Sequence, residues 1–455
     1  MGLSRSSPGG QPDGGRPAAD PYLPGHGDET FDVESYEIEL DYRVSTNRLD
    51  AWVQVVAVAR ERLEVISLDL HGLAVRKVSV NGRRPAKFAV RGGKLRIRLA
   101  DAAATGDRLE VAIRYGGQPG PLQSVWGEVG WEELSDGVIV ASQPHGAPSW
   151  FPCNDRPSSK ATYSVKVTAE SAYTVVANGL LVDRSSGSGQ TTWTYQQAQP
   201  MATYLATVQI GRYEMRTIAA APVRQELFAP RERERVAGAD LAGQPAMMRL
   251  FVDLFGPYPF DGYTVVVTAD DLEIPLEAQG LSVFGANHLD GDGGCERLVA
   301  HELAHQWFGN CLTVGRWSDI WLHEGFACYA EWLWSESSGS DSADALARRH
   351  HTILASAPQD LVLTEPGAEL MFDDRIYKRG ALALHALRLA SGDDTFFAMI
   401  RAWADEHRFA TISTEQFEEH AARYGSTEAL GHWLHQAALP ELPDLDRPRW
   451  RYRKR

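Results

Sequence analysis

Between Asp32 and about residue 217 the chain alternates apolar and polar residues in short runs, a pattern typical of β-strands. The runs are separated by Asn-Gly, Gly-Gly and Asp-containing turns, which favour antiparallel hairpins. Clear examples are YEIELDYRV, AWVQVVAVA, KLRIRL, RLEVAIRY, TYSVKVTA and TTWTYQQ. The pattern predicts an antiparallel β-sandwich-like domain over residues 28–217.

Beyond residue 217 the apolar residues take a helical spacing, with a few strands between the helical segments. ADLAGQPAMMRLFVDLFG reads as a helix closed by Gly256, while YTVVVTA and GLSVFG read as strands. Four later segments are predicted helices: DALARRHHTILA, YKRGALALHALRLA, FFAMIRAWADEH and TEQFEEHAARYG. The whole chain is therefore predicted to be an α+β multidomain protein, with a mostly helical unit over residues 218–437.

Both ends of the chain lack periodic apolar positions. Residues 1–27 are rich in Gly and Pro, and we expect them to be disordered because they cannot bury enough apolar surface. Residues 438–455 form an irregular basic tail in which Trp450 and Tyr452 stand between arginines. Such a tail can bind nucleic acid or an acidic partner, but a solvated terminus is the favoured interpretation.

Composition narrows the possible partners and location. A chain of 455 residues is too long for one ordinary core. Its net charge of -15 argues against a nucleic-acid partner. The four cysteines form no C-x-x-C pair and are expected to be reduced thiols. We find neither a signal-peptide core nor eighteen consecutive apolar residues, so we expect a cytoplasmic protein without a membrane partner. The oligomeric state stays open.

The segment HELAH at 301–305 has the spacing of a zinc-binding helix. His301 and His305 are four residues apart, so on an α-helix they project from one face and can bind one ion. Glu302 is too close in sequence to join the same tetrahedron, which leaves it free to deprotonate a water molecule as a general base. The alternative is a pair of histidines that only pack on a helix face.

A third ligand is expected from a second helix, WLHEGFACYAE, at residues 321–331. Glu324 on this helix follows His305 after eighteen residues and could reach back to the ion. Three protein ligands leave one coordination position open, as catalytic zinc requires. The sequence therefore predicts one Zn²⁺ per chain.

Several separated segments together resemble the gluzincin aminopeptidase family, which includes aminopeptidase N and leukotriene hydrolase. They are HELAHQWFGN with WLHEGFACYAE, FPCNDRP at 151–157, and FGPYPFDGYTVVV. The resemblance runs from about residue 30 to about residue 440. It implies that a thermolysin-like zinc catalytic domain with a short helical C-terminal extension follows the β domain, as in a short bacterial-type member.

The resemblance also implies roles for four more residues. Tyr377, in IYKRG, would donate a hydrogen bond to the oxyanion of the reaction, although its spacing alone fits a core tyrosine. Glu277 would hold the α-ammonium group of the substrate, but its strand reads IPLEA at 274–278 where the family has Gly-x-Met-Glu-Asn. Gln143 would lie beside the same amine, or be a surface glutamine. Glu331 would orient a ligand imidazole, or be structural.

These expectations define an aminopeptidase hypothesis. The substrates would be peptides with a free N-terminus, from which the first amino acid is removed by zinc-activated water. One alternative is a zinc hydrolase of a non-peptide substrate such as an epoxide. Another is a non-catalytic interaction protein that keeps the fold. The preferred first residue depends on pocket side chains that the sequence does not locate.

Overall fold

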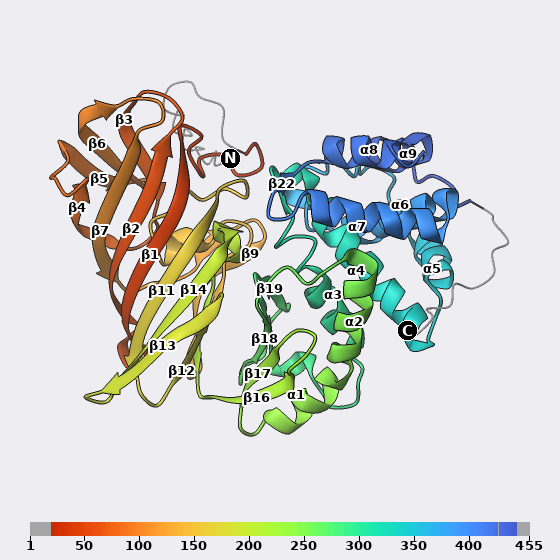
Figure 1. Ribbon diagram of the computed structural model, residues 1–455, viewed down its shortest axis with the longest axis horizontal. Coiled ribbons are helices and arrows are strands. Elements are labelled where there is room, and N and C mark those ends of the chain that lie inside the picture. The colour runs from red at the N-terminus through yellow and green to blue at the C-terminus, as the bar shows by residue number, and fades with distance from the viewer. Residues whose placement is uncertain (1–19, 426, 444–455) are drawn as a thin grey trace, which may run out of the picture.

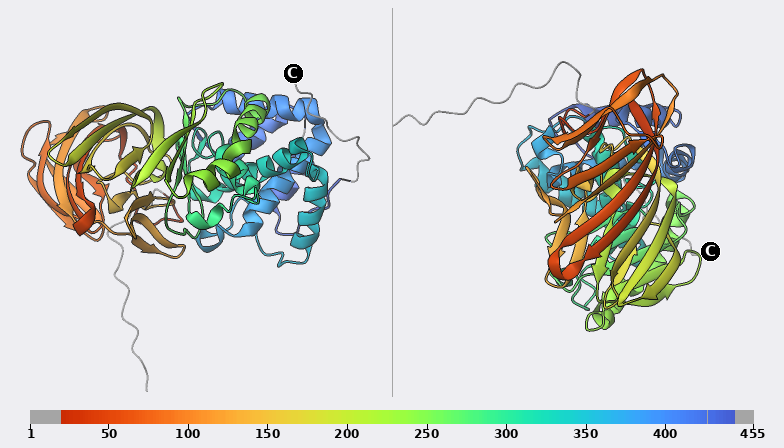
Figure 2. Two further views of the ribbon diagram at one scale, coloured as in Figure 1. Left: turned by 90° about the horizontal axis from the view of Figure 1, so that it is seen from below. Right: turned by 90° about the vertical axis from the view of Figure 1, so that its left-hand side faces the viewer.

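The computed structural model describes residues 20–425 and 427–443, and its β-rich half and helical half lie side by side (Figures 1 and 2). Buried apolar side chains from both halves form one connected cluster. Within the described ranges, no helix has the combination of length and apolar character needed to cross a membrane. The predicted α+β organisation, with the β domain first, is confirmed.

The N-terminal half consists of three sheets. The largest has the order β13-β14-β11-β1-β2-β7-β4. Its strands are Leu180–Gly187, Gln190–Ala202, Lys160–Glu170, Phe31–Arg43, Arg48–Ala59, Arg108–Gly117 and Ala74–Val80. The second, β12-β15-β10-β9-β8, has strands Thr174–Ala177, Val208–Gly211, Gly137–Ala141, Gly127–Leu134 and Leu122–Ser124. The third, β3-β6-β5, has strands Leu63–Asp69, Lys94–Ala103 and Lys87–Arg91.

Strand β6 shows how the alternating pattern builds this half. Leu95, Ile97 and Leu99 are buried, whereas Arg96 and Arg98 between them are exposed. Each buried aliphatic side chain contributes roughly 1.5–3 kcal/mol to folding. The strands pair antiparallel as expected, except that β1 and β11 are parallel. This corrects the purely antiparallel expectation, and it is possible because a long stretch of chain, not a hairpin, joins the two strands.

The C-terminal half combines a mixed sheet with nine α-helices among the described residues. The sheet has the order β16-β17-β18-β20-β19, with strands Tyr213–Ala219, Gln225–Pro230, Tyr263–Val267, Leu281–Phe284 and Leu276–Ala278. A small sheet pairs β21 (Thr313–Val314) with β22 (Thr411–Ile412). Helices α1 to α9 are Glu234–Asp240, Gln244–Phe255, Glu296–Ala304, Trp321–Ser338, Ala343–Ala355, Asp374–Ser391, Asp393–Glu406, Thr414–Ala422 and Thr427–His435. Because β16 belongs to this sheet, the sheets divide between Gly211 and Tyr213, slightly before the expected boundary at 217.

Residues 20–27 are ordered, so the expectation of disorder over residues 1–27 is wrong for this stretch. Asp20 is 3% exposed, and its Oδ2 accepts a hydrogen bond from the Trp317 backbone N–H at 2.7 Å. The hydroxyl of Tyr22 accepts one from the Gly367 N–H at 2.9 Å. These contacts join residues about 300 positions apart, so local composition could not reveal them. Residues 1–19 lie outside the described ranges.

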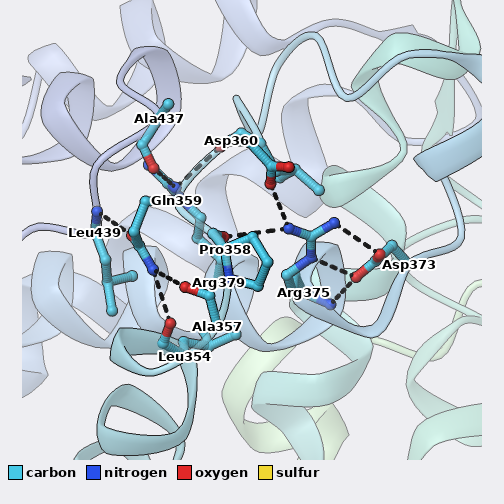
Figure 3. Close-up of polar contacts among 11 residues, drawn as sticks. Leu354, Ala357, Pro358, Gln359, Asp360, Asp373, Arg375, Arg379, Ala437 and Leu439 are labelled. Atoms are coloured by element: carbon cyan, nitrogen blue, oxygen red, sulfur yellow. Dashed lines mark hydrogen bonds and ion pairs between the residues drawn. The ribbon is translucent and has the colours of Figure 1, made fainter.

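Two arginines fix helix α6 against its surroundings (Figure 3). Arg375 donates from Nη1 to Asp360 Oδ1 at 2.6 Å and from Nε to Asp373 Oδ1 at 2.9 Å. Arg379 Nη1 donates to Ala437 O at 2.7 Å, which holds the chain after α9. Tyr377 lies between Arg375 and Arg379 on α6, so the contacts of the two arginines hold the helix on either side of Tyr377. Residues 438–443 have no regular structure, and the basic part of the tail, 444–455, lies outside the described residues.

Candidate metal centre and active site

Helices α3 and α4 bring the three predicted metal ligands together. His301 lies in the last turn of α3, and His305 follows that helix with helical backbone angles (φ −55°, ψ −24°). Glu324 lies in the first turn of α4, and its Oε2 is 3.3 Å from His301 Nε2 and 3.5 Å from His305 Nε2. The three side chains offer donor atoms that all lie within 4.8 Å of one another.

The donor set fits a zinc ion. His301 Nδ1 is 2.7 Å from Glu331 Oε1, and His305 Nδ1 is 3.1 Å from the Phe308 carbonyl oxygen. With both Nδ1 atoms acting as donors, both Nε2 atoms are free to bind a metal. Zinc bonds of about 2.0–2.1 Å in a tetrahedron place neighbouring donors about 3.3 Å apart, which agrees with the distances to Glu324. Two imidazoles and one carboxylate are also a ligand set that catalytic zinc uses.

The charges around this cluster favour a cation. Burial raises the pKa of Glu302 to about 7, and burial also raises the pKa of Glu277. Burial lowers the pKa of the imidazoles, but neighbouring carboxylates outweigh it and raise the pKa to about 10 at His301 and about 9 at His305. Burial alone would raise the pKa of Glu324, yet the imidazoles hold it well below its usual range. The carboxylates around His301 and His305 therefore stabilise positive charge at the predicted metal site.

Glu302 and Tyr377 flank the metal ligands as the sequence predicts. Glu302 is 4% exposed, and its buried Oε2 has no hydrogen-bond partner within the described part of the chain. The Tyr377 ring lies 6.0 Å from the His301 ring, with 18° between their planes. Burial raises the pKa of Tyr377 well above its ordinary value, so its phenol stays protonated and can donate. A carboxylate base and a neutral phenol donor therefore border the site.

Glu277 and Gln143 line one cavity although they come from different halves. Glu277 lies on β19, Gln143 follows β10, and Tyr204 also lines this small cavity, whose volume is about 10 Å³. The Nε2 atom of Gln143 is buried without a partner among the described residues. The Ala278 carbonyl oxygen, next to Glu277 on β19, accepts hydrogen bonds from Gln306 and Asn310 just after His305, which places β19 beside the predicted ligands. The structure thus brings together every residue that the sequence analysis assigned to the site.

Two residues of the histidine motif hold the altered substrate strand, a role that the sequence analysis missed. Gln306 Nε2 and Asn310 Nδ2 donate to the Ala278 carbonyl oxygen at 3.1 and 2.9 Å. Gln306 Oε1 accepts from the Gly280 N–H at 2.8 Å. The Gln-Trp-Phe-Gly-Asn extension of the motif was visible, but no sequence signal showed what it contacts. The backbone of β19 is therefore fixed although Ile274, two residues before its start, is 62% exposed.

Comparisons with known proteins match both halves. The model of the Peptidase M1 N-terminal domain matches residues 32–205, and that of the Peptidase family M1 domain matches residues 241–435. Human endoplasmic reticulum aminopeptidase 1 is 28% identical over 64% of this chain and 34% of its own length. Leukotriene A-4 hydrolase of Xenopus laevis is 24% identical over 91% of this chain and 73% of its own length. This chain thus spans about a third of the human relative.

Solved structures agree over nearly the whole chain. A two-domain M1 zinc metallopeptidase bound to L-arginine is 31% identical with a TM-score of 0.86, and covers 94% of this chain and 100% of its own. An M1 zinc metallopeptidase variant of Deinococcus radiodurans bound to a Tyr-Ser-Ala substrate is 30% identical, with a TM-score of 0.84 and the same coverage. The order of the two halves, the fold and the zinc-binding geometry lead to one conclusion. This chain belongs to the M1 family of zinc metallopeptidases.

Proposed function

We propose that the protein is a zinc-dependent aminopeptidase that removes N-terminal amino acids from peptides. The observation that carries this proposal is the position of Glu277, a half-buried carboxyl on a strand that is hydrogen-bonded to Gln306 and Asn310 and in one cavity with Gln143. A carboxylate there can bind the α-ammonium group of a substrate by a charge-assisted hydrogen bond. Such an anchor fixes the scissile bond one residue from the free end.

In the proposed mechanism His301, His305 and Glu324 hold the ion. Bound zinc supplies Lewis acidity, which polarises the substrate carbonyl and lowers the pKa of water. Glu302 accepts a proton from the attacking water and later transfers it to the leaving amine. Tyr377 donates a hydrogen bond to the oxyanion that forms at the attacked carbonyl. Glu331 keeps the His301 ring oriented by accepting from Nδ1 at 2.7 Å.

A panel of aminoacyl-4-nitroanilides tests the proposal directly. We expect cleavage of at least one member, loss of activity after chelation, and recovery when zinc is returned at one ion per chain. N-acetylated versions of the same substrates should be cleaved far more slowly, because they lack the ammonium group that Glu277 would bind. No cleavage of any member by protein with one bound zinc would overturn the proposal.

The same panel separates the rival activities. A zinc hydrolase of epoxides would leave the anilides intact and open a small epoxide. The similarity to leukotriene A-4 hydrolase is the reason to include an epoxide among the substrates. A non-catalytic interaction protein would turn over neither class. The half-buried Glu277 favours the peptidase, because an epoxide carries no ammonium group for it to bind.

We also propose that the protein works in the cytoplasm. All four cysteines are free thiols and are buried, which supports a reducing compartment. Cell fractionation followed by detection of the protein checks this, and recovery from an oxidising compartment would contradict it.

A further inference from the structure

A second cavity is lined by Glu331, whose carboxylate contacts the predicted metal ligand His301. It has a volume of about 420 Å³, within the range of small-molecule sites, and is lined by residues of α3, α4, α5 and α6. Glu331 lines it and also contacts His301, while Lys378 lines it and follows Tyr377 in the chain. It shares no lining residue with the cavity that contains Glu277 and Gln143. The two cavities are therefore separate. One contains the predicted ammonium anchor, and the other contains Glu331, which contacts His301.

Arg297 is held at the edge of this second cavity. Its Nη1 lies 3.2 Å from both carboxylate oxygens of Glu331, and Glu331 Oε1 lies 2.7 Å from His301 Nδ1. The arginine side chain is 59% exposed, and its Nε and Nη2 contact no acceptor in the part of the chain that the structure describes. One nitrogen thus fixes the guanidinium, and the others are free to bind a ligand.

The other charged residues of the cavity leave the guanidinium of Arg297 available, while Lys378 Nζ also donates to Cys328 Sγ at 3.4 Å. Glu331 is already used by His301 and Arg297, and Glu296 Oε2 accepts from Trp334 Nε1 at 3.2 Å. Lys378 Nζ lies 3.7 Å from Asp374 Oδ1, but the Asp374 side chain is 80% exposed, so water screens this pair. An incoming carboxylate would therefore meet a guanidinium with free N–H groups.

The position of Arg297 fits the leaving end of a short peptide. If Glu277 binds the ammonium group and the first carbonyl lies at the metal ligands, the rest of the peptide must leave on another side. An extended peptide advances about 3.3 Å per residue. The terminal carboxylate of a di- or tripeptide would thus lie one or two residues beyond the attacked carbonyl. Arg297 is two contacts from His301, through the carboxylate of Glu331.

We infer that this cavity binds the leaving portion of the substrate and that Arg297 binds its free C-terminal carboxylate. The favoured substrates are then di- and tripeptides with a free carboxyl end. The inference rests on the proposed aminopeptidase function. Charge-assisted hydrogen bonds are about twice as strong as neutral ones, so an acid should be preferred to the corresponding amide.

The test compares matched peptides that differ only at the C-terminus. Each is X-Gly-Gly with a free carboxylate or a terminal amide, where X is the residue cleaved fastest in the anilide panel. We expect kcat/KM of the wild-type protein to favour the acid about five- to tenfold, equivalent to about 1–1.4 kcal/mol. Arg297→Gln should reduce this ratio to about one, and Arg297→Lys should retain part of it. The acid-to-amide ratio cancels any general loss of activity.

Arg349→Gln is the matched control. Arg349 lies on α5, its side chain is 57% exposed, and it pairs with Asp341 at 2.7 Å, so it matches Arg297 in residue type, exposure and possession of one carboxylate partner. This variant should keep the wild-type ratio. A wild-type protein that cleaves anilides but treats acid and amide alike overturns the inference, and so does a ratio that persists in Arg297→Gln. A protein that cleaves no anilide overturns the proposed function itself, which distinguishes the two failures.

Discussion

At the scale of single residues, Glu302 is the position where a single substitution can best distinguish a chemical role from a structural one. It is buried on α3 between the two histidines, and its Oε2 has no partner among the described residues. Glu302→Gln keeps the shape of the side chain but removes its basicity. We expect kcat to fall by about 10²–10⁴ while zinc content, measured by elemental analysis, stays at one per chain. Glu419→Gln, at an exposed position on α8, should retain activity, and full activity of the Glu302 variant would contradict its role as base.

Tyr377 offers a second residue prediction. Tyr377→Phe preserves the ring that stacks on His301 at 6.0 Å but removes the hydroxyl donor. Because that hydrogen bond is needed mainly in the transition state, kcat should fall about 10²–10³-fold with little change in KM. Steady-state kinetics on the best anilide measures both constants. A rise in KM with unchanged kcat would instead indicate that the hydroxyl binds the substrate ground state.

The residues of the site were predictable to different degrees. The spacing of His301, His305 and Glu302 follows from helical geometry, so these could be assigned from the sequence alone. The resemblance was needed for Tyr377 and Glu277, which lie in unrelated segments. The guanidinium of Arg297 could not be placed, because its contact with Glu331 depends on how α3 packs on α4. Packing between helices is not encoded in the spacing within either one.

At the scale of elements, the alternating pattern located most strands that are buried on one face and missed two strands, β13 and β5, that are mostly exposed. All residues of β13 after Leu180 are exposed, and most of β5 is exposed. Such edge strands need no apolar face, so they carry no alternation to detect. The helical segments after residue 342 were predicted correctly, because each buries an apolar stripe.

Strand β11 makes a contact with the segment between α3 and β21 that predicts a pH dependence. Lys160, its first residue, donates from Nζ to the carbonyl oxygens of Asn310 and Cys311 at 3.3 and 2.8 Å. Burial lowers its pKa from 10.5 to about 8. Between these values the unfolded chain binds more protons, so the contribution of Lys160 to the free energy of unfolding rises from pH 8 to pH 10.5. Below pH 8 this contribution stays constant.

Urea unfolding of wild-type protein and Lys160→Met at pH 7.5 and pH 9.5 measures this effect. The wild-type protein should gain stability relative to the variant at the higher pH, approaching roughly 2–4 kcal/mol over the full range. Lys166→Met is the control, since Lys166 lies on the same strand with a side chain that is 48% exposed. Identical pH dependence in all three proteins would refute the assignment.

At the scale of the whole molecule, the order of the two halves could be predicted but their contacts could not. The change of apolar spacing near residue 217 marked the division, and the sheets change within six residues of it. The contacts across the division join single side chains to distant backbone, as with Tyr22 and Gly367. No periodic pattern records such contacts, so only the structure reveals that the N-terminal half supports the loop before α6.

The hairpin between β8 and β9 provides the test of that support. Trp126, at its tip, donates from Nε1 to Ala368 O at 3.0 Å, and its ring lies 6.0 Å from Phe372 and 5.9 Å from His145. Residues 364–373 lead directly to Tyr377, so Trp126→Ala should loosen this loop and the oxyanion donor with it. We expect faster hydrogen exchange in 364–373 and a three- to tenfold fall in kcat/KM, consistent with a lost hydrogen bond of about 1 kcal/mol.

Two further variants show which part of Trp126 matters. Trp126→Phe keeps a ring but loses the indole donor, so it should give an intermediate effect on both exchange and kcat/KM. Val125→Ala alters the neighbouring residue at the hairpin tip, whose side chain is 71% exposed, and should change neither. If Trp126→Ala leaves exchange in 364–373 at the wild-type rate, the hairpin does not hold this loop. Its conformation would then be set within the C-terminal half, by contacts such as those of Arg375 with Asp360 and Asp373.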